Sequence, residues 1–234
     1  MAFTRRFAPR PIPTLAAAAM VALTVSLGRW QVDRAAEKQA RQDLFEARLA
    51  QPPVRLGPRV DPPGDLLYRR VVMAGRYRPE GQVYIDNRID RGRAGFHVVT
   101  PLELEGGALA LVNRGWVARS AAYPKAPEVP VPPGTVEVAG LVAQPPARVL
   151  ELSADTVTGP VWQNLVIAKY RERMKLDVLP FVVLDARPAP GLAAVEEQPD
   201  AGVARHREYA LTWFALAATC VVLWIVLNLR KAAR

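Results

Sequence analysis

The sequence has very few of the side chains that bind transition metals. Cys220 is its only cysteine and lies within an uncharged run near the C-terminus. This excludes an intrachain disulfide, a Cys-x-x-Cys redox pair, covalent c-type haem attachment and any cysteine-rich zinc or copper centre. The four methionines are scattered, which disfavours a methionine-rich copper carrier. Because the chain has only two histidines, imidazole chemistry depends on His97 or His206.

The sequence motifs of several common enzyme classes are also missing. There is no Gly-x-Ser-x-Gly elbow, phosphate-binding loop, His-Glu-x-x-His or dinucleotide fingerprint. His97 lies in a predicted strand beside Val98 and Val99, where a structural histidine is commoner than a general base. The sequence therefore predicts a protein that is not an enzyme, with a membrane-tethered hydrolase built on His97 as the alternative.

The net charge is strongly positive, at +9, from 31 Lys and Arg against 22 Asp and Glu. The arginines are spread along the chain, and many of them flank apolar runs. Membrane orientation and contact with anionic lipid explain that distribution better than a nucleic-acid-binding patch does. We therefore expect membrane lipid, and not nucleic acid, as a partner.

Two apolar runs near the chain ends predict transmembrane helices. Tyr209–Leu229 is uncharged over 21 residues, enough to cross the hydrocarbon layer of about 30 Å as a helix. Residues 12–32 are long enough to span if Arg29 snorkels to the interface. A cleaved signal peptide is the alternative for this first run, but it continues into Trp30, a typical interfacial anchor. We expect two spans, residues 12–32 and 206–229.

The charges that flank these spans predict their orientation. Residues 1–11 and 230–234 are basic, which places both ends in the cytoplasm and residues 33–205 in the periplasm of a bacterial inner membrane. Ala18, Ala22 and Ser26 recur every four residues and could form a small-residue contact with the second span. An alanine-rich span without specific contacts is the equally good alternative.

The segment between the spans predicts one α+β domain. Asp33–Leu49 is rich in helix formers and ends at Pro52-Pro53, after which apolar residues alternate with a period of two. Pro101 within one strand suggests an edge or a bend. The fold class is therefore α+β, with two transmembrane helices flanking a mainly antiparallel, barrel-like or sandwich-like domain. The predicted strands are 68–77, 82–87, 95–104, 108–117, 135–142 and 179–185, with a Pro-rich loop at 123–134 and a helix at 167–175.

Two groups of residues are candidates for binding. Arg114 and Trp116 at a strand end could form a partner surface. Alternatively, Gly115 allows a bulge, Trp116 packs into the core and the arginine is solvated. Near the second span, Tyr209 and Trp213 follow His206 at i+3 and i+7, on one helical face. That face suits a haem. However, aromatic and basic residues also gather at membrane interfaces without any ligand, and the residues alone favour this second explanation.

Six blocks in order make the chain similar to the surfeit locus protein 1 family. They cover nearly the whole chain, and the first three are LGRWQVDR, YRRVVMAGRY and AGFHVVTPLEL with LVNRGWV. The others are VWQNL, LPFVVLDA and HREYALTWFALAA. Members of that family are assembly factors for haem-copper cytochrome c oxidases that act in the biogenesis of subunit I, and bacterial members are associated with haem a.

The resemblance implies haem a as a transient cofactor, with oxidase subunit I and a haem a synthase as partners. It implies His206 as the haem-iron ligand, with Tyr209 and Trp213 beside it. Arg205 and Arg207 depart from the family pattern around that histidine. A scaffold that stabilises an oxidase intermediate without binding haem is the alternative. Candidate contacts with a partner or with haem propionates are Trp30, Gln31, Arg34, Arg114 and Trp116.

Overall fold

The computed structural model describes residues 5–57, 63–145, 157–196 and 202–231. The chain divides into two compact units. One unit comprises Met1–Leu44 with Gln198–Arg234, and the other comprises Phe45–Glu197. The ends of the predicted cytoplasmic segments and residues 197–201 of the returning linker lie outside the described residues.

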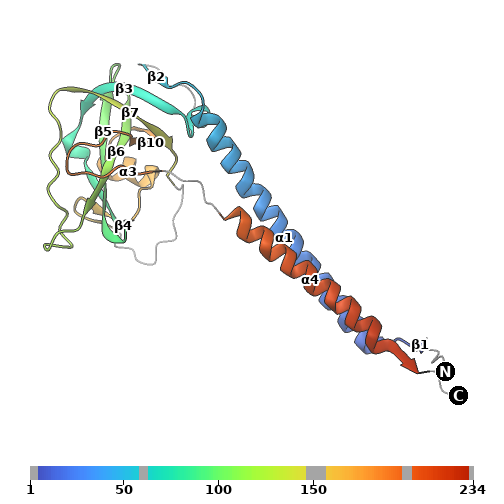
Figure 1. The fold of residues 1–234 in the computed structure, drawn as a ribbon. Helices are drawn as coiled ribbons and strands as arrows, with labels where there is room; N and C mark the ends of the chain where they lie inside the picture. Colours follow the sequence, from blue (N-terminus) through green and yellow to red (C-terminus); the bar gives the residue numbers. More distant parts are fainter. Residues whose placement is uncertain (1–4, 58–62, 146–156, 197–201, 232–234) are drawn as a thin grey trace. The chain divides into compact units, whose positions relative to one another are not determined.

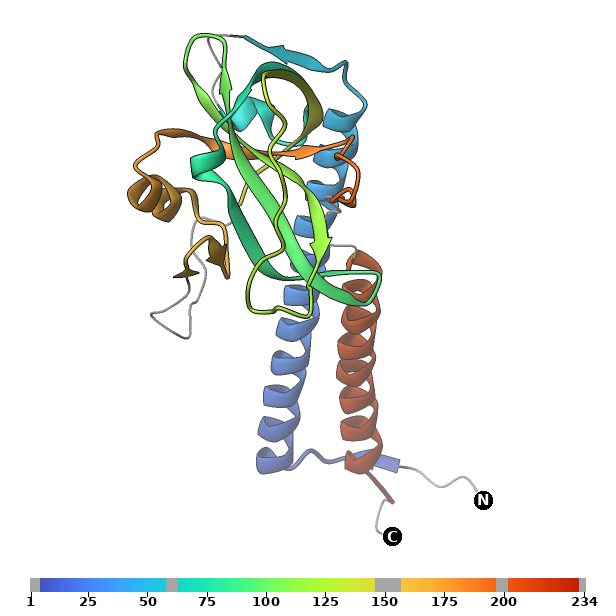
Figure 2. The same ribbon diagram turned by 90° about the vertical axis from the view of Figure 1, so that its left-hand side faces the viewer.

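Two long helices make up most of the first unit. They are α1 (Pro11–Leu49), whose last turn belongs to the second unit, and α4 (Val203–Asn228). Both are long and apolar enough to cross a membrane, and most of their apolar side chains are exposed, unlike those of a core helix in a soluble protein. Figures 1 and 2 show α1 and α4 running side by side. The two predicted apolar helices are therefore present, and they belong to a membrane protein.

Small residues form the contact between these helices. Phe214 of α4 lies over Gly28 of α1, where an added Cβ would come within 2.6 Å of the phenyl ring. The buried positions recur at intervals of four and seven residues, the spacing of left-handed helix packing. These positions are Thr24, Gly28 and Ala35 on α1 and Ala210 and Ala217 on α4.

The predicted small-residue face on the first span is wrong. Ala18, Ala22 and Ser26 are all exposed. A four-residue interval drifts around a helix of 3.6 residues per turn, whereas alternating steps of three and four keep one stripe facing the partner helix. Gly28 also permits a closer approach than Ala or Ser does, because it has no Cβ.

The chain ends of this unit are joined by contacts that the sequence did not suggest. Strand β1 (Arg5–Phe7) pairs antiparallel with β11 (Leu229–Lys231). The Asn228 side chain is buried between them, where its amide donates to the Trp224 carbonyl oxygen at 2.7 Å and its oxygen accepts from the Arg10 backbone N–H at 3.2 Å. The Trp224 indole N–H donates to the Thr14 hydroxyl at 3.0 Å.

The second unit contains a nine-stranded sheet with three short helices. Its first strands are β2 (Val54–Leu56), β3 (Arg70–Tyr77), β4 (Val83–Asp90), β5 (Arg93–Leu104) and β6 (Leu109–Ala118). The later ones are β7 (Thr135–Ala143), β8 (Val157–Thr158), β9 (Val161–Trp162) and β10 (Val178–Asp185). The helices are α2 (Pro63–Leu66), the 3-10 turn η1 (Pro79–Gly81) and α3 (Ile167–Met174).

Five of these strands close into a barrel. Around the ring the order is β3, β5, β6, β10 and β7, and β7 pairs back onto β3. Only β6 and β10 are parallel within the ring. In chain order this ring reads one-two-three-five-four, the connectivity of the five-stranded Greek-key barrel called the oligonucleotide/oligosaccharide-binding (OB) fold. The predicted α+β class with a mainly antiparallel, barrel-like domain is confirmed.

Strand β5 changes partner along its length, which allows the ring to close. Arg93–Val99 pair with β4, whereas Leu102–Leu104 pair with β3. Pro101 stands between the two stretches, and its carbonyl oxygen accepts from the Arg78 backbone N–H at 2.9 Å. The bend suggested by this proline is therefore present.

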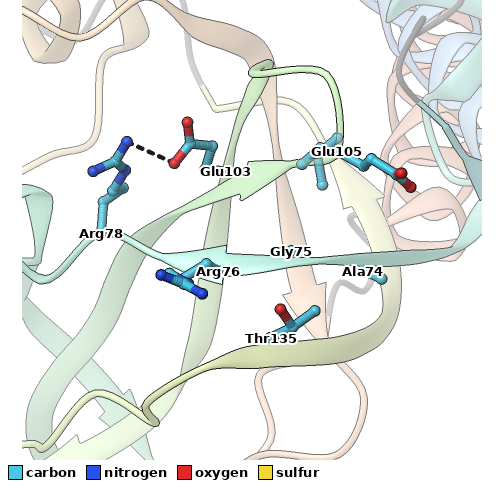
Figure 3. Close-up of a pocket in the computed structure, with 8 residues that line it drawn as sticks. Ala74, Gly75, Arg76, Arg78, Glu103, Glu105 and Thr135 are labelled. Carbon is cyan, nitrogen blue, oxygen red and sulfur yellow. Dashed lines mark ion pairs between the residues drawn. The ribbon is translucent and has the colours of Figure 1, made fainter.

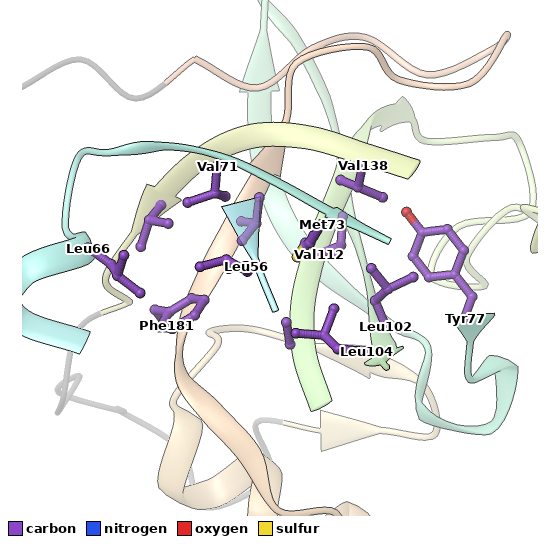
Figure 4. Packing of buried hydrophobic residues seen from close by; sticks show 13 residues of the cluster. Leu56, Leu66, Val71, Met73, Tyr77, Leu102, Leu104, Val112, Val138 and Phe181 are labelled. Carbon is purple, nitrogen blue, oxygen red and sulfur yellow. The ribbon is translucent and has the colours of Figure 1, made fainter. Parts of the chain in front are cut away.

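The barrel encloses one apolar cluster and carries another on its outer face. Figure 4 shows Met73, Leu102 and Phe181 among the inner residues, which come from opposite sides of the ring. The outer cluster packs Trp162 and Tyr170 from β9 and α3 against β6 and β10. Each of β5, β6 and β10 is therefore covered on both faces, which explains their nearly continuous apolar sequences.

Candidate functional site

His206 in the first unit is hydrogen-bonded across the helix pair. Its Nδ1 lies 2.6 Å from Oε1 of Gln31 on α1. Because a side-chain carbonyl oxygen can only accept, Nδ1 carries the proton in this bond. In the neutral ring this bond selects the tautomer whose lone pair is on the other nitrogen, Nε2, the form in which imidazole ligates a metal.

The helix contact explains why these two residues meet. Gln31 follows Gly28 by three residues and His206 precedes Ala210 by four, so both lie on the stripe that faces the other helix. Both side chains are partly buried. The sequence named each of them as a candidate but contained no local signal for their contact, because 175 residues separate them.

The other predicted residues near His206 lie on or beside that stripe. Trp213 is partly buried, seven residues further along α4. Tyr209 and Trp30 are 52% and 51% exposed. Arg34 forms an ion pair with Glu37 at 2.6 Å while half of its side chain remains exposed. The structure thus brings together His206 and Gln31, with Trp213 on the same side of α4.

Arg114 in the second unit lies inside the protein. Arg114 is only 3% exposed. Its guanidinium donates to Gln82 Oε1 at 2.9 Å and to the Pro130 carbonyl oxygen at 2.7 Å. It also lies over the Tyr77 ring, 5.2 Å from the centroid, and burial lowers the pKa of Arg114. The expectation of a solvated arginine is wrong, and burial of both donors does not favour direct contact with a partner. Its role is to brace the 123–134 loop against the barrel.

The neighbouring residues agree with the alternative given for this stretch. Gly115 has a φ of +134°, and the pairing of β5 with β6 shifts register beside it, so a bulge is present. Trp116 is 7% exposed, and its indole N–H donates to the Arg88 carbonyl oxygen at 2.8 Å. A left-handed φ here turns the strand so that the large indole covers Gly95 of β5.

His97 is partly buried on the outer face of the barrel. Burial, and secondarily the charge of Arg88, lowers its pKa to about 4, so the ring is neutral at neutral pH. Its ring nitrogens have no hydrogen-bond partner in the described ranges. A general base of the serine-hydrolase kind needs an orienting carboxylate and an adjacent nucleophile, and no described side chain of either kind hydrogen-bonds to this ring.

A further hollow on the second unit lies where β3 meets β5. It has a volume of about 430 Å³. Figure 3 shows Arg78 and Glu103 facing one another across it, and their closest atoms are 2.6 Å apart. Its lining residues are exposed charges and backbone, and the pairing of Arg78 with Glu103 leaves little net charge for a ligand. Within the described ranges, no three His, Cys, Asp or Glu side chains come together in a way that could hold a metal ion.

Known proteins match this chain over nearly its whole length. It is 25% identical over 215 residues to a SURF1-like protein of Rickettsia felis, covering 87% of this chain and 91% of the relative. A SURF1-like protein of Drosophila melanogaster is 29% identical over 229 residues, covering 87% of this chain and 73% of the relative. Surfeit locus protein 1 of Xenopus tropicalis is 26% identical over 232 residues, covering 90% and 74%. Since the model of the SURF1 family also matches residues 18–218, the chain belongs to the SURF1 family.

Proposed function

We propose that this protein is a membrane-anchored assembly factor for haem-copper cytochrome c oxidase. In this role it assists the delivery of haem a to subunit I, or the maturation of that subunit, without catalytic turnover. Oxidase subunit I and a haem a synthase are the proposed partners. Residues 33–205 are proposed to lie in the periplasm of a bacterial inner membrane. Family membership and the hydrogen bond between His206 and Gln31 support the proposal.

The side chains around His206 suit a haem carried as cargo. The Gln31 oxygen holds the Nδ1 proton, which aims the Nε2 lone pair away from Gln31 and fixes the ring. Trp213 offers an aromatic surface on the same side of α4, and Tyr209 and Trp30 add exposed aromatic area. Arg34 could pair with the haem propionates, since half of its side chain is accessible.

The position of His206 would favour transient binding. A single imidazole that is only partly buried would supply one bond to the iron. A carrier must release its cargo, so one protein ligand suits this task better than two.

Haem content of the purified protein tests this proposal. The chain is expressed together with the haem a pathway, purified in detergent and examined by its absorption spectrum. We expect wild type to retain haem a, His206→Ala to lose it, and Gln31→Leu to retain several-fold less because the imidazole is no longer oriented. His97→Gln, which removes the other histidine, is the matched control and should retain haem at the wild-type level.

A scaffold that binds no haem is the second candidate. The exposed apolar surface of α1 and α4 favours it, because such a surface could pack against oxidase helices as readily as against lipid. Absence of haem from wild type, together with crosslinking of the second unit to subunit I, would support the scaffold. A normal haem a₃ spectrum in membranes that lack this protein would contradict both candidates.

A further inference from the structure

Two adjoining hollows form a cleft on the outer face of the barrel. Their volumes are about 290 and 410 Å³, and both are lined by Arg88, His97 and Val195. The smaller one continues over Asn113 of β6 to Asn164, just before α3. All of these residues belong to the second unit, whereas His206 belongs to the first.

The cleft occupies the position at which barrels of this connectivity bind ligands. Its floor is the outer face of β5 and β6, the second and third strands of the ring. One wall comes from the segment between the first and second ring strands, through Arg88. The other comes from the segment between the fourth and fifth, through Gln144 and Asn164. These strands and connections form the binding surface of the OB fold.

The side-chain amide of Asn113 has a donor that no described residue accepts. The residue is 5% exposed, and its Oδ1 accepts from the Gly115 backbone N–H at 3.2 Å. Its Nδ2 makes no hydrogen bond to any described residue. Because Asn113 lines the smaller hollow, this N–H is open to the cleft and available to water or to a ligand there.

Arg88 and His97, which line the same hollow as Asn113, add two further donors. The guanidinium of Arg88 is held toward the cleft by the Gln163 carbonyl oxygen at 3.2 Å and Asn164 Oδ1 at 3.4 Å. The neutral ring of His97 has one N–H to donate and, like the Asn113 amide, no partner in the described part of the chain. Three donors of different kinds therefore face one small space.

The remaining lining of the smaller hollow decides what kind of molecule fits. Arg88 is the only charged residue among those that line it. Most of the others are apolar, and a volume of about 290 Å³ is at the lower limit of small-molecule sites. The apolar lining residues are Ile85, Val99, Ala143, Pro145, Leu165, Val182, Leu184 and Val195.

We propose that this cleft binds a carboxylate carried on a short apolar body. The carboxylate would accept from Arg88, Asn113 Nδ2 and His97, while the apolar part would lie against Val99 and Leu165. A small fatty acid and the C-terminal residue of a peptide share this chemistry. The site goes beyond the proposed role in oxidase assembly and does not depend on haem binding.

The two histidines provide a direct readout of binding. The full chain is labelled with ¹⁵N-histidine and placed in lipid nanodiscs, and His206→Ala assigns the two imidazole signals. Hexanoate is titrated into wild type, with hexanamide as the uncharged probe of matched shape. We expect hexanoate to shift the His97 signal with saturation and to leave the His206 signal unchanged, and hexanamide to bind at least tenfold more weakly. N-acetylleucine is the second acid, and tighter binding by it than by hexanoate identifies a peptide end as the preferred source.

Two variants locate the carboxylate. Asn113→Asp keeps the oxygen that accepts from Gly115 but replaces the free donor with a negative charge, so hexanoate binding should fall at least tenfold. Arg88→Gln should weaken it by about tenfold, while the exposed Arg76→Gln, outside the cleft, should leave it unchanged. Hexanoate affinity is followed on the His97 signal, and circular dichroism checks folding.

Several results would overturn the proposal. Equal affinity for hexanoate and hexanamide would remove the carboxylate from it. Saturable binding that folded Asn113→Asp leaves unaltered would place the acid elsewhere. A His97 signal that no probe moves would show that the cleft does not take this class of ligand.

Discussion

The phenol of Tyr170 donates to the carbonyl oxygen of Gly81 at 2.6 Å, and both residues are buried. This bond joins α3, on the outer face of the barrel, to the turn between β3 and β4. Gly81 fits closely beneath the ring, because an added Cβ would come within 2.8 Å of the hydroxyl oxygen and 2.4 Å of Pro101. The hydrogen bond therefore holds α3, and with it the outer apolar cluster, against the barrel.

Tyr170→Phe tests the contribution of this bond. Removing the hydroxyl leaves the buried carbonyl of Gly81 without its partner, so we expect the free energy of unfolding to fall by about 1–3 kcal/mol. Denaturant unfolding followed by tryptophan fluorescence measures the change. Tyr123→Phe, which removes an exposed hydroxyl bonded to Asp86, is the control and should cost under about 1 kcal/mol. Equal losses in the two variants would contradict the assigned difference in burial.

Replacement of Arg114 should loosen the loop that it holds. In Arg114→Met the oxygen of Pro130 loses a charged donor, and we expect a loss of about 2–4 kcal/mol in stability. Limited proteolysis should then cut within residues 123–134 at least several-fold faster than in wild type. Arg173→Met is the control, because this arginine is exposed on α3. Uniformly faster cleavage along the chain would indicate global unfolding instead of a lost brace.

Gly95 should tolerate no side chain. A Cβ there would lie 2.3 Å from the Val117 carbonyl oxygen and 2.4 Å from the Trp116 indole, both in the adjacent strand. We expect Gly95→Ala to lower the free energy of unfolding by about 1–3 kcal/mol, because neither the backbone nor the buried indole can move away. Gly57→Ala is the control and should be neutral, because an added Cβ there would have no described atom within 4 Å apart from its chain neighbours. Similar melting temperatures for the two variants would argue against the packing described.

His97 predicts a loss of stability in mild acid. Its pKa is about 4 in the folded protein and about 6.5 when unfolded, so the unfolded chain binds a proton first as the pH falls. Stability contributed by the neutral ring is complete above pH 6.5 and is lost as the pH falls toward 4, by about 3 kcal/mol. Unfolding free energies of wild type and His97→Gln, measured from pH 7 to 4.5, isolate this effect from that of Asp90 and Glu196, which line the same cleft. If wild type and His97→Gln lost the same unfolding free energy as the pH fell, the assignment of this effect to His97 would be wrong.

Local patterns predicted the long strands well and the short ones poorly. β3, β5 and β10 contain enough alternating or continuous apolar residues to be recognised. Strands β8 and β9 have two residues each, too few to show a period. Ring closure depends on β3 pairing with both β5 and β7, a long-range choice that no local pattern contains.

The candidate site shows the same limit. His206 could be named from the sequence because histidine is rare here and lies at the start of an apolar helix. Its hydrogen bond with Gln31 could not, because it depends on how two helices from opposite ends of the chain face one another. Arg114 was expected in solvent because arginine is normally exposed, and its burial required the carbonyl of Pro130, in a loop without periodic sequence.

The hydrogen bond between Gln31 and His206 also has a consequence for biosynthesis. Gln31 is synthesised before the second unit, and His206 only after it. The imidazole therefore acquires its orienting partner only when the last helix has inserted beside the first. An incomplete chain, or one cut after Gln31 by a signal peptidase, would present at most an unoriented histidine, so cargo binding at this site would be limited to the finished protein.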